Sequence, residues 1–218
     1  MSFNARDRMI ARAARDIQPG MTVNLGIGLP TKVVNFIPKD FPVCFHSENG
    51  ISGVGPVLSN DDADRNLIDA GGAYVSPLPG TAYFDSATSF AMVRSGRLSL
   101  TLLGAFQVAA NGDLANWKIP GVFAPGIGGA VELAQKARKV AVLTTHCDKK
   151  GRSKIVETCS LPLTAKSCVD RIYTDMAVID VSDNGLVLRE VAEGLTVSDV
   201  VAATDAKLNV PAGTCPTF

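Results

Sequence analysis

The sequence predicts a single α/β domain over residues 1–218, with a mixed, largely parallel sheet flanked by helices. Short apolar stretches at 21–25, 43–46, 98–103 and 139–145 alternate with helical patterns, which is typical of strands joined by helical crossovers. Closely spaced candidate strands at 154–156, 177–181 and 186–190 predict hairpins beside that sheet. The chain shows no internal repeat, and no linker divides it.

The first elements are a helix, a strand, a glycine loop and a second helix. Apolar residues recur at helical spacing over 4–17, and Pro19 with Gly20 ends that helix. The strand at 21–25 runs into Gly26-Ile-Gly-Leu-Pro30, where Pro30 suits the first turn of a helix over 31–36. A second strand, 43–46, is followed at once by turn-forming residues, so Glu48 is predicted at a strand end.

The middle of the chain is predicted to be rich in loops. Residues 59–64 are polar and acidic, and Pro77-Leu-Pro-Gly80 is predicted to break the chain. We expect a helix over 86–94 capped by Ser86, a strand over 98–103, and an irregular stretch over 111–125.

A glycine loop opens the last part of the chain. Gly126-Ile-Gly-Gly129 leads into a predicted helix over 130–137 and a strongly apolar strand over 139–145. Asp183-Asn-Gly185 predicts a hairpin turn, and Thr196 with Asp199 predicts the start of a short helix. The tail after Pro211 is predicted to be disordered.

Composition excludes several classes of function. Hydrophobic residues make up 46% and charged residues 19% of the chain, and the formal net charge is zero with no basic run. We therefore expect no nucleic-acid partner, and no apolar segment predicts a membrane span or a secretory signal. The five cysteines are scattered without a close pair, which argues against a metal site and favours a reducing, cytoplasmic location.

The strongest candidate for chemistry is the segment His46-Ser-Glu-Asn-Gly50. A carboxylate on a tight turn at a strand end is held out of the sheet among backbone amides, which is how a nucleophile is presented. From residue types alone, a glutamate in a surface turn remains the alternative. His46 and Glu48 also match the HxE element of zinc deaminases, but the close cysteine pair that such a site needs is missing.

A succession of motifs resembles the B subunits of family I CoA-transferases, specifically those of 3-oxoacid CoA-transferases. Ser47-Glu-Asn-Gly50 with Gly53-Val-Gly-Pro56 resembles the active-site signature of that family. The resemblance continues in order over most of the chain, in Asn24-Leu-Gly-Ile-Gly-Leu-Pro30, Leu103-Gly-Ala-Phe-Gln-Val108, Gly112-Asp-Leu-Ala-Asn-Trp117, Gly128-Gly-Ala130, Leu161-Pro-Leu-Thr164 and residues 168–171.

The resemblance implies a NagB/RpiA/CoA-transferase-like fold and a covalent mechanism. Glu48 would carry a glutamyl-CoA thioester, with coenzyme A as a substrate and no metal, nucleotide or redox cofactor. Because family members of this size are half of a catalytic unit, the resemblance also implies an A subunit as partner, in an α2β2 assembly, and little or no activity from this chain alone.

Other site residues are predicted with alternatives. Gly126, Gly128 and Gly129 are predicted to supply a backbone donor to the reacting centre, or to form only a helix-entry turn. Asn49 and Gly50 would shape the pocket or serve the turn alone. Gly26 and Gly28 form a weak phosphate-loop pattern, and tight strand-helix packing is the preferred interpretation. Asn116 and Trp117 would line the pocket or contact the partner, or Trp117 would be a structural anchor.

Three classes of function follow. The first is transfer of CoA to a short 3-oxoacid of the acetoacetate type, favoured over 3-oxoadipate by the segment Pro79-Gly-Thr-Ala-Tyr-Phe-Asp-Ser-Ala87. An acyl-CoA hydrolase would use the same glutamate and admit water to the intermediate. A non-enzymatic binding subunit is the third class, and it requires Glu48 to be buried and unreactive.

Overall fold

The computed structural model describes residues 4–59 and 61–218. Residues 1–3 of the predicted domain and Asn60 of the predicted polar stretch lie outside the described part. In chain order the described elements are α1 (Ala5–Ala14), β1 (Thr22–Leu25), the 3₁₀ helix η1 (Pro30–Phe36), β2 (Cys44–Ser47), β3 (Ile51–Val57), β4 (Val75–Tyr83), α2 (Ser86–Arg94), β5 (Leu100–Leu103), β6 (Gln107–Ala109), β7 (Leu114–Ala115), α3 (Ala130–Lys136), β8 (Val140–Leu143), β9 (Ile155–Val156), β10 (Arg171–Tyr173), β11 (Ala177–Ser182), β12 (Gly185–Val191), α4 (Val197–Ala203) and β13 (Leu208–Asn209).

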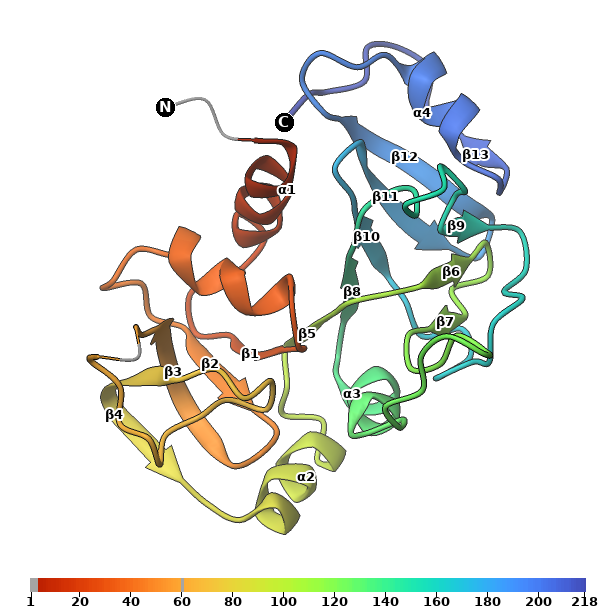
Figure 1. The fold of residues 1–218 in the computed structure, drawn as a ribbon. Helices are drawn as coiled ribbons and strands as arrows, with labels where there is room; N and C mark the ends of the chain where they lie inside the picture. The colour runs from red at the N-terminus through yellow and green to blue at the C-terminus, as the bar shows by residue number, and fades with distance from the viewer. Residues whose placement is uncertain (1–3, 60) are drawn as a thin grey trace.

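One sheet runs through the described chain in the order β13-β12-β11-β10-β8-β5-β1-β2-β3-β4. Its centre, from β10 to β2, is parallel throughout. Antiparallel pairs extend it at both ends, through β3 and β4 on one side and β11 and β12 on the other. Figure 1 shows the blue C-terminal strands at one end and the yellow β3 and β4 at the other. The predicted mixed, largely parallel sheet is confirmed.

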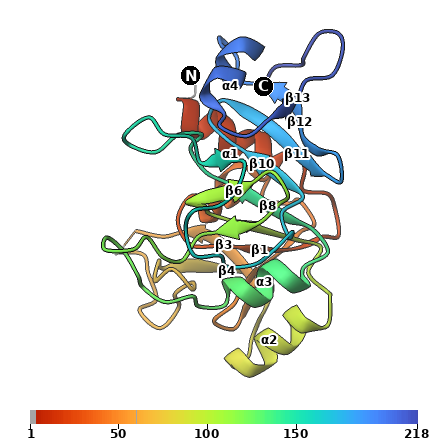
Figure 2. The same ribbon diagram turned by 90° about the vertical axis from the view of Figure 1, so that its right-hand side faces the viewer.

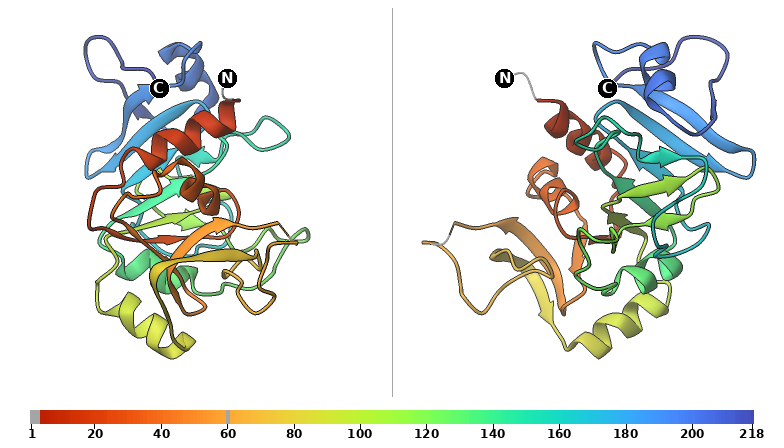
Figure 3. Two further views of the ribbon diagram at one scale, coloured as in Figure 1. Left: turned by 90° about the vertical axis from the view of Figure 1, so that its left-hand side faces the viewer. Right: turned by 45° about the vertical axis from the view of Figure 1, so that its right-hand side comes forward.

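Side chains alternate between the two faces of the central strands, because successive residues of a strand point to opposite sides. Leu143 and Tyr173 belong to a core cluster that also contains Met9 and Ile10 of α1. Val142 and Ile172 belong to a second cluster that contains Leu133 of α3. The sheet is therefore covered on one face by α1 and η1, and on the other by α3, α4 and a small sheet (Figures 2 and 3).

The small sheet has the strand order β7-β6-β9 and was not predicted as a sheet. Its strands are only two or three residues long, which leaves little periodic signal in the sequence. Val108, Leu114 and Ile155 are fully buried in the second cluster. The small sheet thus places the segment before Ile155 next to the carboxyl ends of β5 and β8.

Three further predictions were wrong. Pro77-Leu-Pro-Gly80 does not break the chain but lies within β4, which tolerates proline because it is the edge strand and needs fewer backbone donors. The cap of α2 is Asp85, whose side chain accepts from the Thr88 amide, and not Ser86. The tail is not disordered at its end, because Pro216 and Phe218 exchange backbone hydrogen bonds with Val191.

Strand order determines where a site can form. From β1 the chain continues to β2 on one side and later returns to β5 on the other side. Such a switch in direction leaves a crevice at the carboxyl ends of the two neighbouring strands, β1 and β5. Because β1, β2, β5 and β8 are parallel, the segments that follow all four strands meet at this edge.

Candidate active site

A cavity of about 660 Å³ lies at this edge of the sheet. Its walls come from the ends of β1, β2, β5 and β8, from the 123–130 loop and from the segment before β9. Most of its lining is apolar, as in most small-molecule sites of this size. Glu48 and Lys154 are the charged side chains among its described lining residues.

Glu48 occupies the turn that joins β2 to β3. The Gly50 amide donates to the Ser47 carbonyl at 3.0 Å, which closes the turn. Gly50 has φ +119°, and a β-carbon there would lie 1.9 Å from the Phe84 carbonyl oxygen. Glycine is therefore required at position 50, and the turn holds the half-buried Glu48 side chain at the cavity.

His46 anchors the strand that leads to Glu48. The buried His46 ring contacts the Asn24 amide through Nδ1 at 3.1 Å and the Ser89 hydroxyl through Nε2 at 2.9 Å. Burial lowers the pKa of His46 to about 4, so the ring is neutral near pH 7. The contacts tie β2 to β1 and to α2, and they give His46 a structural role.

Gly129 approaches Glu48 from the start of α3. A β-carbon on Gly129 would lie 2.9 Å from Glu48 Oε1 and 2.5 Å from Phe90 Cζ. The Gly129 backbone N–H acts on the Glu48 carboxylate and lowers its pKa. The glycine loop at 126–129 thus brings a backbone donor to the carboxylate.

The environment of Glu48 has two opposed electrostatic effects. Burial raises the pKa of Glu48, and the nearby Gly129 backbone N–H partly offsets the rise. The net result is a carboxylate that is poorly solvated and more basic than one on the surface. Both properties favour its use as a nucleophile.

The predicted site residues divide into two groups. Those that line the cavity with Glu48 are Gly26, Asn116, Trp117, Gly126, Gly128 and Gly129. Gly28, Asn49 and Gly50 are absent from the described lining. The exposed Asn49 donates to the Ile68 carbonyl at 2.8 Å, so its side chain secures the turn from outside.

Three of the lining residues also have clear packing roles. A β-carbon on Gly26 would lie 2.9 Å from the Leu102 carbonyl oxygen, so the chain packs tightly at this loop. Asn116 accepts from the Thr164 hydroxyl at 2.6 Å and donates to the Gly104 carbonyl at 3.0 Å. Trp117 donates to the Leu163 carbonyl at 3.2 Å, as an anchoring tryptophan would.

Lys154, Thr144 and Phe106 also line the cavity, although they were not predicted as site residues. Thr144 and Phe106 follow the predicted strands β8 and β5. Their positions in the sequence could therefore have placed them at the same edge of the sheet as Glu48. The sequence could not place Lys154 there, because Lys154 reaches the cavity through the pairing of β9 with β6, which was not predicted.

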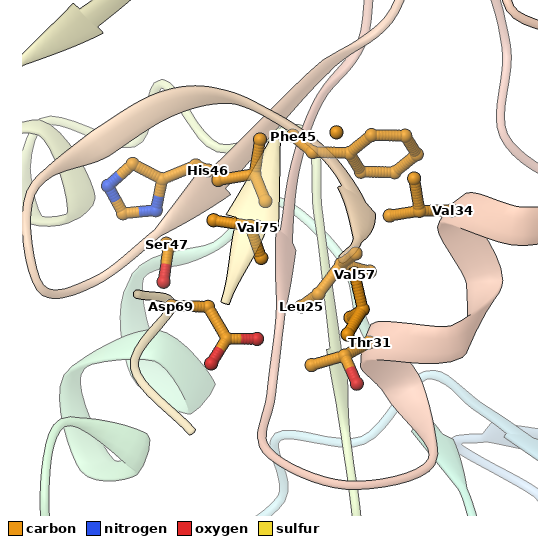
Figure 4. Close-up of a pocket in the computed structure, with 11 residues that line it drawn as sticks. Leu25, Thr31, Val34, Phe45, His46, Ser47, Val57, Asp69 and Val75 are labelled. Atoms are coloured by element: carbon orange, nitrogen blue, oxygen red, sulfur yellow. The ribbon is translucent and has the colours of Figure 1, made fainter. Parts of the chain in front are cut away.

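A second cavity of about 20 Å³ lies between β2 and η1 and has room for about one water molecule. Figure 4 shows Ser47 and Asp69 on one side of it and Thr31 and Val34 on the other. The Ser47 hydroxyl accepts from the Ala70 amide at 2.9 Å. Since Ala70 lines the large cavity, this bond fixes a loop beside Glu48.

Side-chain geometry gives no sign of a metal centre in the described residues. Among residues 4–59 and 61–218, no group of three or more His, Cys, Asp or Glu side chains is arranged to hold a metal ion. No helix of the described part of the chain combines the length and apolar character that crossing a membrane requires.

Comparisons with known proteins agree with the motif succession. The family model described as coenzyme A transferase matches residues 6–203. The chain is 51% identical to the human mitochondrial succinyl-CoA:3-ketoacid coenzyme A transferase 2, over 92% of this chain and 39% of that protein. It is 48% identical to the B subunit of the 3-oxoadipate CoA-transferase of Acinetobacter baylyi, over 95% of this chain and 97% of that one.

A solved structure shows the same fold at much lower identity. An acyl-CoA transferase apoenzyme from Escherichia coli O157:H7 superposes with a TM-score of 0.78 and 18% identity. The match covers 100% of this chain and 44% of that longer chain. On the family match and the identities to its relatives, the chain belongs to the coenzyme A transferase family, as a transferase subunit of the B type.

Proposed function

We propose that this chain, together with an A subunit, moves CoA between an acyl-CoA and a free short 3-oxoacid of the acetoacetate type, through a glutamyl-CoA thioester on Glu48. The observation that carries the proposal is the half-buried Glu48 carboxylate at the cavity wall, with the Gly129 backbone packed closely against it.

The chemistry has two symmetrical halves. Glu48 attacks the thioester carbonyl of the donor, which forms an acyl-glutamyl anhydride and releases the CoA thiolate. The thiolate attacks the glutamyl carbonyl of the anhydride, which forms the glutamyl-CoA thioester and releases the donor acid. The acceptor carboxylate then repeats both steps in reverse order. The thioester bond energy is kept throughout, so no metal, nucleotide or redox cofactor is required.

Carboxylates are weak nucleophiles toward thioesters, so the site has to stabilise the transition states. Each attack develops negative charge on a carbonyl oxygen, and a fixed N–H donor lowers the energy of that oxyanion. Gly129 supplies a backbone N–H beside the Glu48 carboxylate. Loss of one such donor typically costs about 3 kcal/mol of transition-state stabilisation. Binding energy from the remote parts of CoA adds to this effect.

An A subunit as partner, in an α2β2 assembly, is part of the proposal. Large apolar side chains near the cavity are exposed in the isolated chain, including Val122 at 79% and Ile27 at 64%. The chain spans 39% of the human relative and 44% of the Escherichia coli chain, so these longer proteins contain more than this unit. Both observations support a second subunit that completes the site.

Substrate choice is the finer part of the proposal. The relatives' names include both 3-ketoacid and 3-oxoadipate transferases, and the 3-oxoadipate acceptor is the alternative. A panel of acceptor acids, assayed with the assembled complex, tests the choice. A clear preference for a six-carbon dicarboxylate would overturn the acetoacetate assignment.

Mass spectrometry of the complex tests the covalent step. After incubation with acetoacetyl-CoA and no acceptor, we expect a CoA adduct on the peptide that contains Glu48, and none in Glu48→Gln. Unchanged turnover in Glu48→Gln would refute the nucleophile, and an unmodified Glu48 in a folded complex would favour a binding subunit. Full activity of this chain without the A subunit would refute the shared site.

The same complex separates transfer from hydrolysis. A transferase forms the new acyl-CoA only when acceptor acid is added, and free CoA does not accumulate. A hydrolase releases free CoA at a rate that acceptor does not change. The location predicted from the scattered cysteines, the cytoplasm, stays a prediction.

A further inference from the structure

Lys154 places a positive charge on the cavity wall that the proposed chemistry does not use. It lies just before β9, and its backbone is fixed on both sides: its amide donates to the His146 carbonyl at 2.9 Å, and its carbonyl accepts from the Val108 amide at 2.8 Å. The side chain therefore starts from a rigid part of the fold.

Two threonines orient the Lys154 ammonium. It donates to Thr144 Oγ1 at 3.0 Å and to Thr145 Oγ1 at 2.9 Å. Each hydroxyl in turn donates to a backbone carbonyl, of Ala105 at 3.0 Å and of Cys147 at 2.8 Å. Because an ammonium has three N–H donors, one remains for a ligand in the cavity that Lys154 lines.

The charge of Lys154 is not neutralised by a direct partner. Lys154 takes part in none of the ion pairs found among residues 4–59 and 61–218. Asp175 and Asp148 act on it only at longer range. Asp175 accepts from the His146 amide at 2.7 Å, and Asp148 pairs with Arg152 at 2.6 Å. A half-buried cation of this kind favours an anionic ligand.

We propose that Lys154 is a subsite for a second carboxylate on the acyl group, and that it selects donors such as succinyl-CoA whose acyl chain ends in a carboxylate. This inference rests on the proposed function. Glu48 and Lys154 line the same cavity, so an acyl group whose reacting carbonyl meets Glu48 can direct its other end toward Lys154. The rest of the described cavity wall is largely apolar and offers that carboxylate no other cation.

The test compares two donors on the assembled complex. Adduct formation on Glu48 is followed in single turnovers with succinyl-CoA and with acetoacetyl-CoA, which has a neutral oxygen and no distal carboxylate. In Lys154→Met we expect the rate with succinyl-CoA at subsaturating donor to fall about 10- to 100-fold, because a hydrogen bond to a charged group is lost. The rate with acetoacetyl-CoA should fall less than threefold.

Two variants control this comparison. Lys154→Arg keeps the charge and should recover part of the succinyl-CoA rate. Lys166→Met removes a positive charge from an exposed position that is absent from the cavity lining, and both donors should react as with the wild type. The acetoacetyl-CoA rate also reports whether Lys154→Met has folded and assembled.

The outcomes separate this inference from the proposed function. Equal slowing with both donors, or no slowing with either, overturns the carboxylate subsite. A wild-type complex that reacts with acetoacetyl-CoA but not with succinyl-CoA overturns it as well. A wild-type complex that forms no adduct on Glu48 with either donor overturns the proposed function itself.

Discussion

The Gly129 α-carbon is packed so closely against Glu48 that a β-carbon on residue 129 would lie 2.9 Å from the carboxylate oxygen Oε1. The backbone conformation at Gly129 is ordinary for any residue, with φ −77°. Space, and not backbone strain, therefore favours glycine at this position, since an added β-carbon would push the Phe90 and Glu48 side chains aside. The same closeness lets the Gly129 amide act on the carboxylate.

Gly129→Ala should lower the rate of adduct formation in the assembled complex by about 100-fold or more, because the methyl group displaces Glu48 from the donor. Gly104→Ala is a matched control in the same cavity, since the nearest atom to its β-carbon would be 4.0 Å away. Gly104→Ala should lower the rate of adduct formation far less than Gly129→Ala does. Equal losses in the two variants would show that the contact with Glu48 is not the cause.

Gly50→Ala should destabilise the chain by more than about 2 kcal/mol, since its β-carbon would collide with the Phe84 carbonyl oxygen at 1.9 Å. Gly72 also has a positive φ, of +80°, but open space around its β-carbon. Gly72→Ala should therefore cost only the backbone term of about 1 kcal/mol. Urea unfolding measures the free energy of unfolding of both variants. Equal losses would mean that a small backbone shift relieves the collision at position 50.

The pH dependence of adduct formation should report the raised pKa of Glu48. The carboxylate form is the nucleophile, so the rate increases with pH through the pKa of Glu48 and levels off above it. Burial raises this pKa above its ordinary value of 4.5. Rapid-quench measurements between pH 4 and pH 8 should therefore place the midpoint above 4.5. A midpoint below that value would mean that the amide donor outweighs burial.

The sequence was informative wherever an apolar run was followed by turn residues. That pattern placed β1, β2 and β8 correctly and put Glu48 at a strand end. It failed for β3 and β4, because Gly53, Gly55 and the prolines at 77 and 79 resemble loop residues. An edge hairpin accepts them, since its outer strand needs fewer backbone donors and its bulges use glycine.

Local sequence could not place the partners of Glu48. The glycine loop at 126–129 has the same pattern whether it approaches the carboxylate or only starts a helix. The choice depends on α2 and α3 packing together, with Phe90 against Gly129 and Arg94 paired with Glu132 at 2.7 Å. Lys154 similarly depends on the pairing of β6 with β9. Both contacts join segments that are far apart in the chain.

Stability should fall with acid because two buried histidines resist protonation. Burial lowers the pKa of His46 and of His146 to about 4 from an ordinary 6.5. Between these two pH values the unfolded chain binds protons that the folded chain does not. The contribution of the two histidines to the free energy of unfolding is therefore fully present above about pH 6.5 and is lost as pH falls toward about 4.

The loss should approach about 1.4 kcal/mol per pH unit for each histidine near the middle of that window. His146→Gln should remove about half of the slope, since His46 still titrates in the variant. Urea unfolding of both proteins at pH 7, 6 and 5 measures this. The carboxylates with lowered pKa, Asp16 and Asp180, have ordinary values of 3.8 and lose their contribution only at lower pH. An identical slope in the variant would mean that His146 titrates alike in the folded and unfolded chains, so that its contacts with Thr174 and Thr204 offset the effect of burial.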